Sequence, residues 1–169
     1  MKRKADGSIE RYKARLVAKG FSQRPSFDFN ETFAPTAKFA AIRTILALAG
    51  LQDLHLHSID ISHAFINGDL DEEVYMQQPE GFDLGSPQKV LRLRKSIYGL
   101  KQASRMWYQK LQSVLVEMGF QCVKVDSSIY VFKKDKVHII LPVFVDDITL
   151  ASNSLEAIHS VIKQLSSHF

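Results

Sequence analysis

Three aspartates have the residue type and the surroundings for metal-dependent chemistry. Asp60 ends the segment 56–60, and the adjacent pair Asp146 and Asp147 lies inside the apolar segment 143–148. Adjacent carboxylates repel each other, and an apolar strand disfavours ionised groups, so divalent cations would relieve both costs. Carboxylates from separate strands can hold two Mg²⁺ ions for phosphoryl transfer. Most Asp-Asp pairs are solvated turns, but the apolar flanks favour a metal site here.

Length and composition indicate one folded domain, or one domain with a small subdomain. The chain has 169 residues, of which 46% are hydrophobic, enough for a core. Cys122 is the single cysteine, so an intramolecular disulfide is excluded and a zinc cluster is disfavoured. The basic residues 2–4 are followed by no apolar stretch, and no run approaches the roughly 18 apolar residues of a membrane span. We therefore expect an intracellular protein of the cytoplasm or nucleus, not secreted and without a membrane partner.

The net charge of +4 is unevenly distributed along the chain. Residues 1–24 hold eight basic side chains against two acids, and residues 89–110 hold seven basic side chains and no acid. Between them, residues 44–88 hold eight acids and no Lys or Arg. Basic stretches that flank an acidic centre suit a protein that grips a polyanion while metal ions occupy the acidic part. Ordinary solvated surface remains the alternative for these charge runs.

Hydrophobic periodicity and turn residues predict the secondary structure. The first helix is expected to bury Phe39, Ile42, Ile45, Leu46 and Ala49. The predicted elements, in chain order, are a hairpin over 2–20 with its return strand at 12–18, a helix from near Thr36, a strand ending around Asp60, a mostly irregular segment 67–88 with a short strand at 74–76, a strand at 90–93, a helix over 103–118 ended by Gly119, a hairpin of strands 129–132 and 137–145, a return strand at 148–150, and a last helix with a capping box of Asn153 and Glu156.

This order predicts an α+β layer with an antiparallel sheet. Long-range pairing would bring the strand of Asp60 beside the hairpin of Asp146 and Asp147, with two helices behind the sheet. Pro142 lies in the strand that leads to the aspartate pair and has no N–H to donate, so we expect a sheet edge, a bulge or a distortion there.

Six motifs lie along the chain and together cover almost all of it. They are RYKARLVAKGF at 11–21, ETFAP at 31–35, DISHAFINGDL at 60–70, EVYMQQPEGF at 73–82, SIYGLKQASR at 96–105 and FVDD at 144–147. In sequence and in order these motifs resemble the reverse transcriptase domain of copia-type LTR retrotransposons.

The resemblance implies a right-hand polymerase fold with fingers and an antiparallel palm sheet backed by helices. Residues 1–55 and 67–100 would be fingers-like, and residues 56–66 and 101–169 palm-like. Nothing resembles the thumb, so we expect the thumb to be absent from this fragment of a retrotransposon polyprotein. The implied partners are an RNA or DNA template-primer, dNTPs and other segments of the polyprotein.

The resemblance also assigns the catalytic residues. Asp60 corresponds to the family's first catalytic aspartate, and Asp146 and Asp147 to the second and third. These carboxylates would bind two Mg²⁺ ions, with Mn²⁺ as a possible substitute: one ion activates the primer 3′-hydroxyl and the other neutralises the triphosphate and the leaving pyrophosphate. We expect Asp146 to bind metal more directly than Asp147.

Nucleotide-binding residues follow from the same resemblance. Phe65 matches the position at which a bulky ring excludes the ribose 2′-hydroxyl; without the family it would be read as a core phenylalanine. The Tyr98-Gly99 segment would pack on the incoming nucleotide. Candidate triphosphate ligands in the basic hairpin are Lys4, Lys13 and Arg15, with Arg15 the first choice because a guanidinium can bind phosphate with two donors.

Template and primer contacts are expected from two segments. Lys101 and Arg105 would reach the template backbone, and Phe144 and Val145 would lie along the template-primer. The family usually has Tyr where this chain has Phe144.

Two other functions remain open from the sequence. A catalytically inactive relic would bind nucleic acid through its basic segments without using the carboxylates. A two-metal nuclease would need a histidine or further acids at the metals, and alternation from Asp60 places His63 on the opposite face. Metal-dependent dNTP binding would separate the polymerase from the relic.

Overall fold

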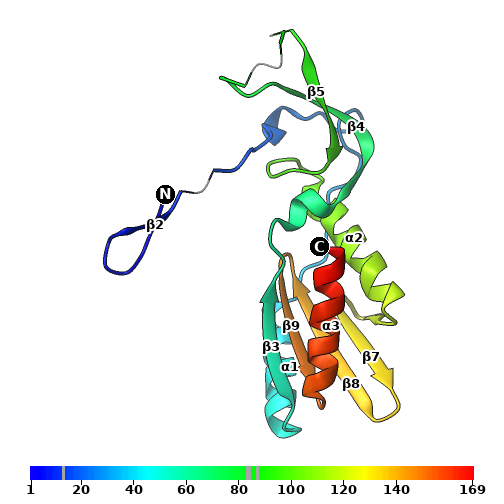
Figure 1. The fold of residues 1–169 in the computed structure, drawn as a ribbon. Helices are drawn as coiled ribbons and strands as arrows, with labels where there is room; N and C mark the ends of the chain where they lie inside the picture. Colours follow the sequence, from blue (N-terminus) through cyan, green and yellow to red (C-terminus); the bar gives the residue numbers. More distant parts are fainter. Residues whose placement is uncertain (13, 83–84, 87) are drawn as a thin grey trace.

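The computed structural model describes residues 1–12, 14–82, 85–86 and 88–169 and has an α+β architecture (Figure 1). The helices are the α-helices α1 (Phe39–Leu51), α2 (Ala103–Glu117) and α3 (Leu155–His168) and the short 3₁₀ turns η1 (Gly20–Ser22) and η2 (Ala64–Asn67). The strands are β1 (Lys2–Arg3), β2 (Ile9–Arg11), β3 (His55–Asp60), β4 (Asp69–Gln77), β5 (Val90–Lys95), β6 (Gln121–Val123), β7 (Asp126–Lys134), β8 (Val137–Phe144) and β9 (Asp147–Ser152).

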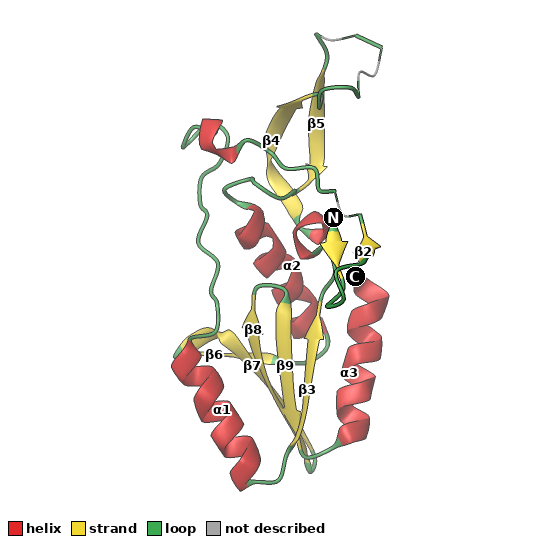
Figure 2. Ribbon diagram, turned by 90° about the vertical axis from the view of Figure 1, so that its left-hand side faces the viewer, coloured by secondary structure: helices red, strands yellow, loops and turns green. Residues whose placement is uncertain are grey.

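A five-stranded antiparallel sheet in the order β3-β9-β8-β7-β6 forms the centre of the molecule. Helices α2 and α3 cover one face, where Leu111 and Ile158 join the core with Leu141, Ile148 and Leu150. Helix α1 lies against the other face (Figure 2). The antiparallel sheet predicted from the sequence is confirmed, with helices on both of its faces rather than only behind it.

Side chains of β3 and β9 alternate between the two faces of the sheet, and this alternation separates the core residues from the aspartates. Ile59 is the register partner of Ile148, which pairs with Val143, and all three pack in the core under α2 and α3. Asp60 follows Ile59 and Asp147 precedes Ile148, and these two aspartates are also register partners. Successive side chains of a strand point to opposite faces of the sheet. The two aspartates therefore leave the sheet on the face away from this core.

Pro142 does not produce the predicted edge or bulge. Strand β8 lies between β9 and β7, and the pairs on either side of the proline, Ile140 with Ala151 and Val143 with Ile148, keep a single register. Pro142 itself is a register partner of Ile129 on β7. The pairing of β8 with β9 skips Leu141 and Pro142, so the missing donor interrupts the ladder locally without shifting its register.

A second region lies beyond the upper end of this sheet (Figure 1). Strands β4 and β5 pair with each other, and β1 and β2 form a separate short hairpin that projects from the body. A small cluster of Ala18, Val74, Leu100 and Ala103 is its buried core. We call the five-stranded sheet with its three α-helices the sheet body, and the strands β1, β2, β4 and β5 with residues 14–38 and 96–102 the hairpin region.

The N-terminal predictions were partly wrong. The return strand of the first hairpin is β2, so residues 12 and 14–18 are not in it. Instead the Ala18 N–H donates to the Tyr98 carbonyl at 2.7 Å, which draws this segment away from β1. Helix α1 begins at Phe39 rather than near Thr36, and it buries only Ile45 and Ala49 of its predicted apolar face, because it covers the sheet along one narrow line.

Two further boundaries differ from the sequence prediction. Strand β4 runs through nine residues in a segment expected to be mostly irregular, because pairing with β5 extends it. The last helix is capped by Ser154, whose hydroxyl accepts from the Ala157 N–H at 3.2 Å. Asn153 instead donates to the Lys136 carbonyl in the turn between β7 and β8 and accepts from the His138 N–H of β8. Helix α2, ended by Gly119 with φ +90°, is confirmed.

Candidate active site

The site is built from the upper ends of β3 and β9 and from the turn between β8 and β9. Asp60 is the last residue of β3 and Asp147 the first of β9, and their Cα atoms are register partners. Directly opposed residues of an antiparallel pair carry Cβ atoms about 4.5–5.5 Å apart on one face. Both side chains are exposed. Within the described part of the chain, no ion pair or hydrogen bond engages the carboxylates of Asp60, Asp146 or Asp147.

Asp146 lies in a turn whose backbone is held on both sides. Phe144 and Asp147 are register partners, so Val145 and Asp146 form a two-residue turn. The Trp107 indole N–H donates to the Val145 carbonyl at 2.7 Å, and the Ile61 N–H donates to the Asp146 carbonyl at 2.9 Å. Ile61 directly follows Asp60, so the turn is tied to the strand that carries the first aspartate.

The donor set suits Mg²⁺ only in part. The described residues contain no group of three or more His, Cys, Asp and Glu side chains arranged to hold a metal ion. Asp60 and Asp147 nevertheless offer oxygen ligands from facing positions. Mg²⁺ in nucleotide enzymes is bound through one or two carboxylates and completed by substrate phosphates and water rather than by a full protein cage. The pair therefore fits an ion that is completed by a nucleotide.

Three of the residues predicted to bind nucleotide lie in contact. The rings of Phe65 and Tyr98 meet edge to face, with centroids 4.9 Å apart and planes at 66°. The Arg15 guanidinium carbon lies over the Tyr98 ring, 5.2 Å from its centroid. These three side chains come from η2, from the turn before α2 and from the N-terminal segment, and they form one continuous group.

Two glycines allow the N-terminal segment to lie against the Tyr98 turn. Gly99 has φ +92°, and a Cβ there would come within 2.2 Å of the Ala18 carbonyl oxygen. A Cβ on Gly20 would come within 1.9 Å of the Gly99 carbonyl oxygen. Any larger residue at either position would push the two segments apart and carry Arg15 away from Tyr98.

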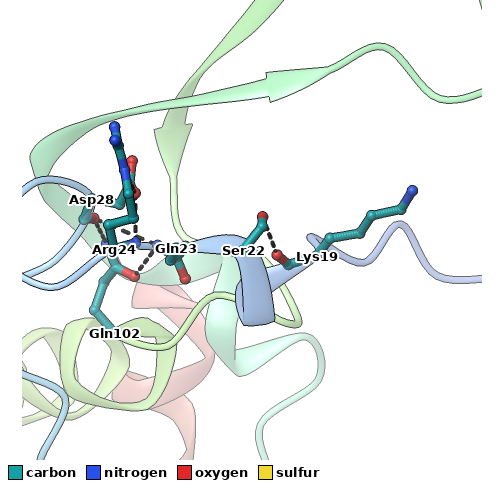
Figure 3. Close-up of polar contacts among 6 residues, drawn as sticks. All are labelled: Lys19, Ser22, Gln23, Arg24, Asp28 and Gln102. Carbon is teal, nitrogen blue, oxygen red and sulfur yellow. Dashed lines mark hydrogen bonds and ion pairs between the residues drawn. The ribbon is translucent and has the colours of Figure 1, made fainter.

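A polar network fixes the segment 19–28 to the start of α2 (Figure 3). Gln102 is fully buried; its amide nitrogen donates to the Asp28 carbonyl at 2.9 Å, and its amide oxygen accepts from Gln23 at 3.0 Å. Gln23 in turn accepts from the Lys101 backbone N–H at 2.8 Å. Arg24 bonds through its backbone N–H to the Asp28 carboxylate at 2.7 Å.

The residues predicted to reach the template-primer are spread over the molecule. Arg105 forms an ion pair with Glu31 at 2.7 Å, and the Lys101 ammonium lies 5.7 Å from the ring centroid of Phe29. Phe144 is half exposed on the face of Asp147, and Val145 is partly buried in the turn.

Lys4 does not join the nucleotide group, because it lies in the turn of the projecting β1–β2 hairpin (Figure 1). Lys13 lies outside the described residues. His63 is exposed with φ +59°, beyond the end of β3, so the strand alternation assumed for it does not extend that far.

A groove of about 700 Å³ lies in the hairpin region, away from the aspartates. Leu16, Lys19 and Gln23 line one wall, and Val74, Met76 and Leu93 line the other. None of the three aspartates lines it, so the groove is not the centre of the candidate chemistry.

The groups that hold the site together were not predicted from the sequence. Trp107 lies in the helix predicted over 103–118 and Gln102 in the motif SIYGLKQASR, and neither was assigned a role. The residue types themselves indicate such contacts: a buried indole N–H needs a hydrogen-bond acceptor, and a glutamine beside an apolar helix face needs hydrogen-bond partners.

The chain belongs to the reverse transcriptase (RNA-dependent DNA polymerase) family, whose model matches residues 1–169. Its sequence is 43% identical over 98% of the chain to the Retrovirus-related Pol polyprotein from transposon RE1 of Arabidopsis thaliana. The corresponding polyprotein from transposon RE2 of the same plant is 44% identical over 98% of the chain, and that from transposon TNT 1-94 of Nicotiana tabacum is 42% identical over 100% of the chain. The resemblance to copia-type retrotransposons is thereby confirmed.

The chain spans 11% of the two Arabidopsis polyproteins and 13% of the tobacco one. No solved structure matches the chain. Among the described residues, none of the helices combines the length and the apolar character needed to cross a bilayer.

Proposed function

We propose that this chain is the fingers-and-palm part of an RNA-directed DNA polymerase, in which a dNTP extends a primer paired to an RNA or DNA template. Residues 1–55 and 67–100 would be the fingers, and residues 56–66 and 101–169 the palm. The observation that carries the proposal is the pairing of Asp60 with Asp147 at one sheet end, with Asp146 in the adjoining turn.

In this reaction the primer 3′-hydroxyl oxygen attacks the α-phosphorus of the dNTP, and the bond to the β-phosphate oxygen breaks to release pyrophosphate. Bound Mg²⁺ ions would make the hydroxyl more acidic and neutralise the phosphate charge. Asp60, Asp146 and Asp147 would hold these ions, Asp146 more directly than Asp147. The side chains of Asp60 and Asp147 are exposed and that of Asp146 is partly buried, and none of the three carboxylates is paired among the described residues.

The group of Arg15, Tyr98 and Phe65 would bind the nucleotide. Phe65 is partly exposed, so one part of its ring can face a sugar and exclude a 2′-hydroxyl. The Arg15 guanidinium can donate two hydrogen bonds to a phosphate while its plane stays on Tyr98. Tyr98 and Gly99 would form the surface on which the base or sugar packs.

The first test is primer extension by the purified chain on poly(rA)/oligo(dT) with Mg²⁺ or Mn²⁺. We expect incorporation that Asp146→Asn lowers by a factor of about 100 or more, because the ions lose a ligand at the reacting phosphate. Asp135→Asn is the matched control. It removes the same charge from the turn at the opposite end of the same sheet, and we expect it to retain full activity.

Metal-dependent dNTP binding is the second measurement. Binding of dNTP that requires Mn²⁺ and is lost in Asp146→Asn supports the polymerase site even if extension is slow. Binding of the template-primer without any metal-dependent dNTP binding contradicts the proposal and identifies an inactive nucleic-acid-binding relic. Equal activity of Asp146→Asn and Asp135→Asn would contradict the role of the aspartates.

A further inference from the structure

Val145 adopts a backbone conformation that a valine does not favour. Of the two residues in the β8–β9 turn, Val145 has φ +58°, whereas Asp146 is not among the residues with positive φ. These signs are those of a type II′ turn, whose first central position is normally glycine. A β-branched residue at positive φ is disfavoured, so surrounding contacts must hold it there.

The contacts that hold this turn act on the two peptide groups next to Asp146. Trp107 donates to the Val145 carbonyl, which belongs to the peptide preceding Asp146. Ile61 donates to the Asp146 carbonyl, which belongs to the peptide following it. When both planes beside one Cα are fixed, the direction of its Cα–Cβ bond is fixed as well. The two bonds therefore aim the Asp146 side chain.

The bond from Trp107 also selects one turn type. Types II′ and I′ differ mainly by rotation of the central peptide, which here joins Val145 and Asp146. The carbonyl that Trp107 binds is the one that this rotation would turn away. The indole itself is anchored: Trp107 is 1% exposed on α2, and its ring packs edge to face on Phe169 at 4.9 Å.

We propose that Trp107 is a positioning residue for Asp146: its indole N–H keeps the Val145–Asp146 peptide in the orientation that presents the carboxylate beside Asp60. The inference rests on the proposed function for its catalytic consequence. The turn geometry that it predicts does not depend on that function and is tested separately.

The test uses the fact that Trp107 is the only tryptophan in the chain. Replacement by 3-benzothienylalanine keeps the size and aromatic character of the ring and puts sulfur in place of the N–H. Phe169→Leu is the matched control, because it removes the other ring contact of Trp107 and keeps the donor. Trp107→Phe is not a substitute for the analogue, since it also opens a cavity in the core.

The first readout is the turn itself, followed by NMR in the unliganded chain. We expect the indole N–H to exchange slowly, and the backbone couplings of Val145 and Asp146 to change in the analogue while those of Leu150 stay the same. In Phe169→Leu the turn couplings should be retained. A rapidly exchanging indole N–H, or turn couplings identical in parent and analogue, would overturn the inference.

The second readout is Mn²⁺ binding, measured by electron paramagnetic resonance. Replacing a residue that orients a metal ligand typically lowers metal affinity about 10- to 100-fold. We expect a loss of that size in the analogue but not in Phe169→Leu. Equal affinity in parent and analogue would overturn the positioning role. If the parent itself bound no Mn²⁺, the proposed function would fail, while the NMR comparison would still decide whether Trp107 holds the turn.

Discussion

The sheet body and the hairpin region are stabilised in different ways. The sheet body has one continuous apolar core between the five-stranded sheet and the helices α2 and α3. The hairpin region has two-stranded sheets and a buried cluster of four residues, three of them alanine or valine. Close backbone approach at Gly20 and Gly99 and the buried amide of Gln102 hold its own segments together, and Gly68, just before β4, lies against the α2 backbone at Met106 and Trp107.

This difference matches what each region would do in a polymerase. Metal-binding carboxylates must be held within a fraction of an ångström, which a packed sheet achieves better than a loop. A segment that binds and releases a nucleotide at each step must come from the less stable part of a molecule. The aspartates lie on the sheet body, whereas Arg15 and Tyr98 lie in the hairpin region.

The largest effect is expected from Leu150→Ala in the sheet body. Leu150 is fully buried on β9, and removing its side chain should lower the free energy of unfolding by about 2–5 kcal/mol. Urea unfolding followed by circular dichroism measures this. Leu51→Ala, at an 86% exposed position at the end of α1, is the matched control and should change stability by less than about 0.5 kcal/mol. Similar values for the two variants would mean that the sheet body is not the stable part.

Much of the sheet body could be predicted from the sequence, because its patterns are local. Alternation in β8 and β9 and the apolar spacing of α2 predicted these elements, and the predicted pairing of the Asp60 strand with this hairpin is confirmed in β3 and β9. Helix α1 shows the limit: its sequence offers five apolar positions, but only two are buried because the sheet leaves it little surface.

The contacts that complete the site could not be predicted in this way. Trp107 and Val145 are 38 residues apart, and Gln23 and Gln102 are 79 residues apart. Such contacts depend on how the elements pack, and a single polar atom leaves no periodic pattern. The positive φ of Val145 was hidden for the same reason, since the residue type argues against it.

A smaller and more local effect is expected from Gly99→Ala. The new methyl group would collide with the Ala18 carbonyl at a positive φ, so the segment 14–20 should separate from the Tyr98 turn at a cost of about 1–3 kcal/mol. Hydrogen exchange should show faster exchange at Ala18 and unchanged exchange in β9. Gly50→Ala is the matched control. It lies in α1 with open space around it and should be neutral or stabilising by up to about 1 kcal/mol. Faster exchange across the whole sheet would show that the two regions unfold together.

The smallest effect is expected from Asp69→Asn, at the start of β4. A hydrogen bond from the Lys95 ammonium is the main cause that lowers the pKa of Asp69, and Lys110 of α2 lies 3.5 Å from the same carboxylate. The carboxylate therefore links the hairpin region to the sheet body. Because its side chain is 58% exposed, solvent screening limits the contribution to roughly 0.2–1 kcal/mol.

The pH dependence gives this last prediction its sign. A carboxyl group whose pKa is lowered on folding stabilises the protein above its unfolded pKa, and this contribution disappears as the pH falls through the folded value. Asp69→Asn should therefore be less stable than the parent at about pH 7, and the difference should shrink as the pH falls below about 4 and when salt is added. Asp71→Asn is the matched control: it removes the same charge from the same strand, where Asp71 has no ion pair among the described residues, and should change stability at about pH 7 by less than about 0.5 kcal/mol. If the stability difference between the parent and Asp69→Asn persisted below about pH 4, the packing and hydrogen bonds of Asp69, rather than its charge, would join the two regions.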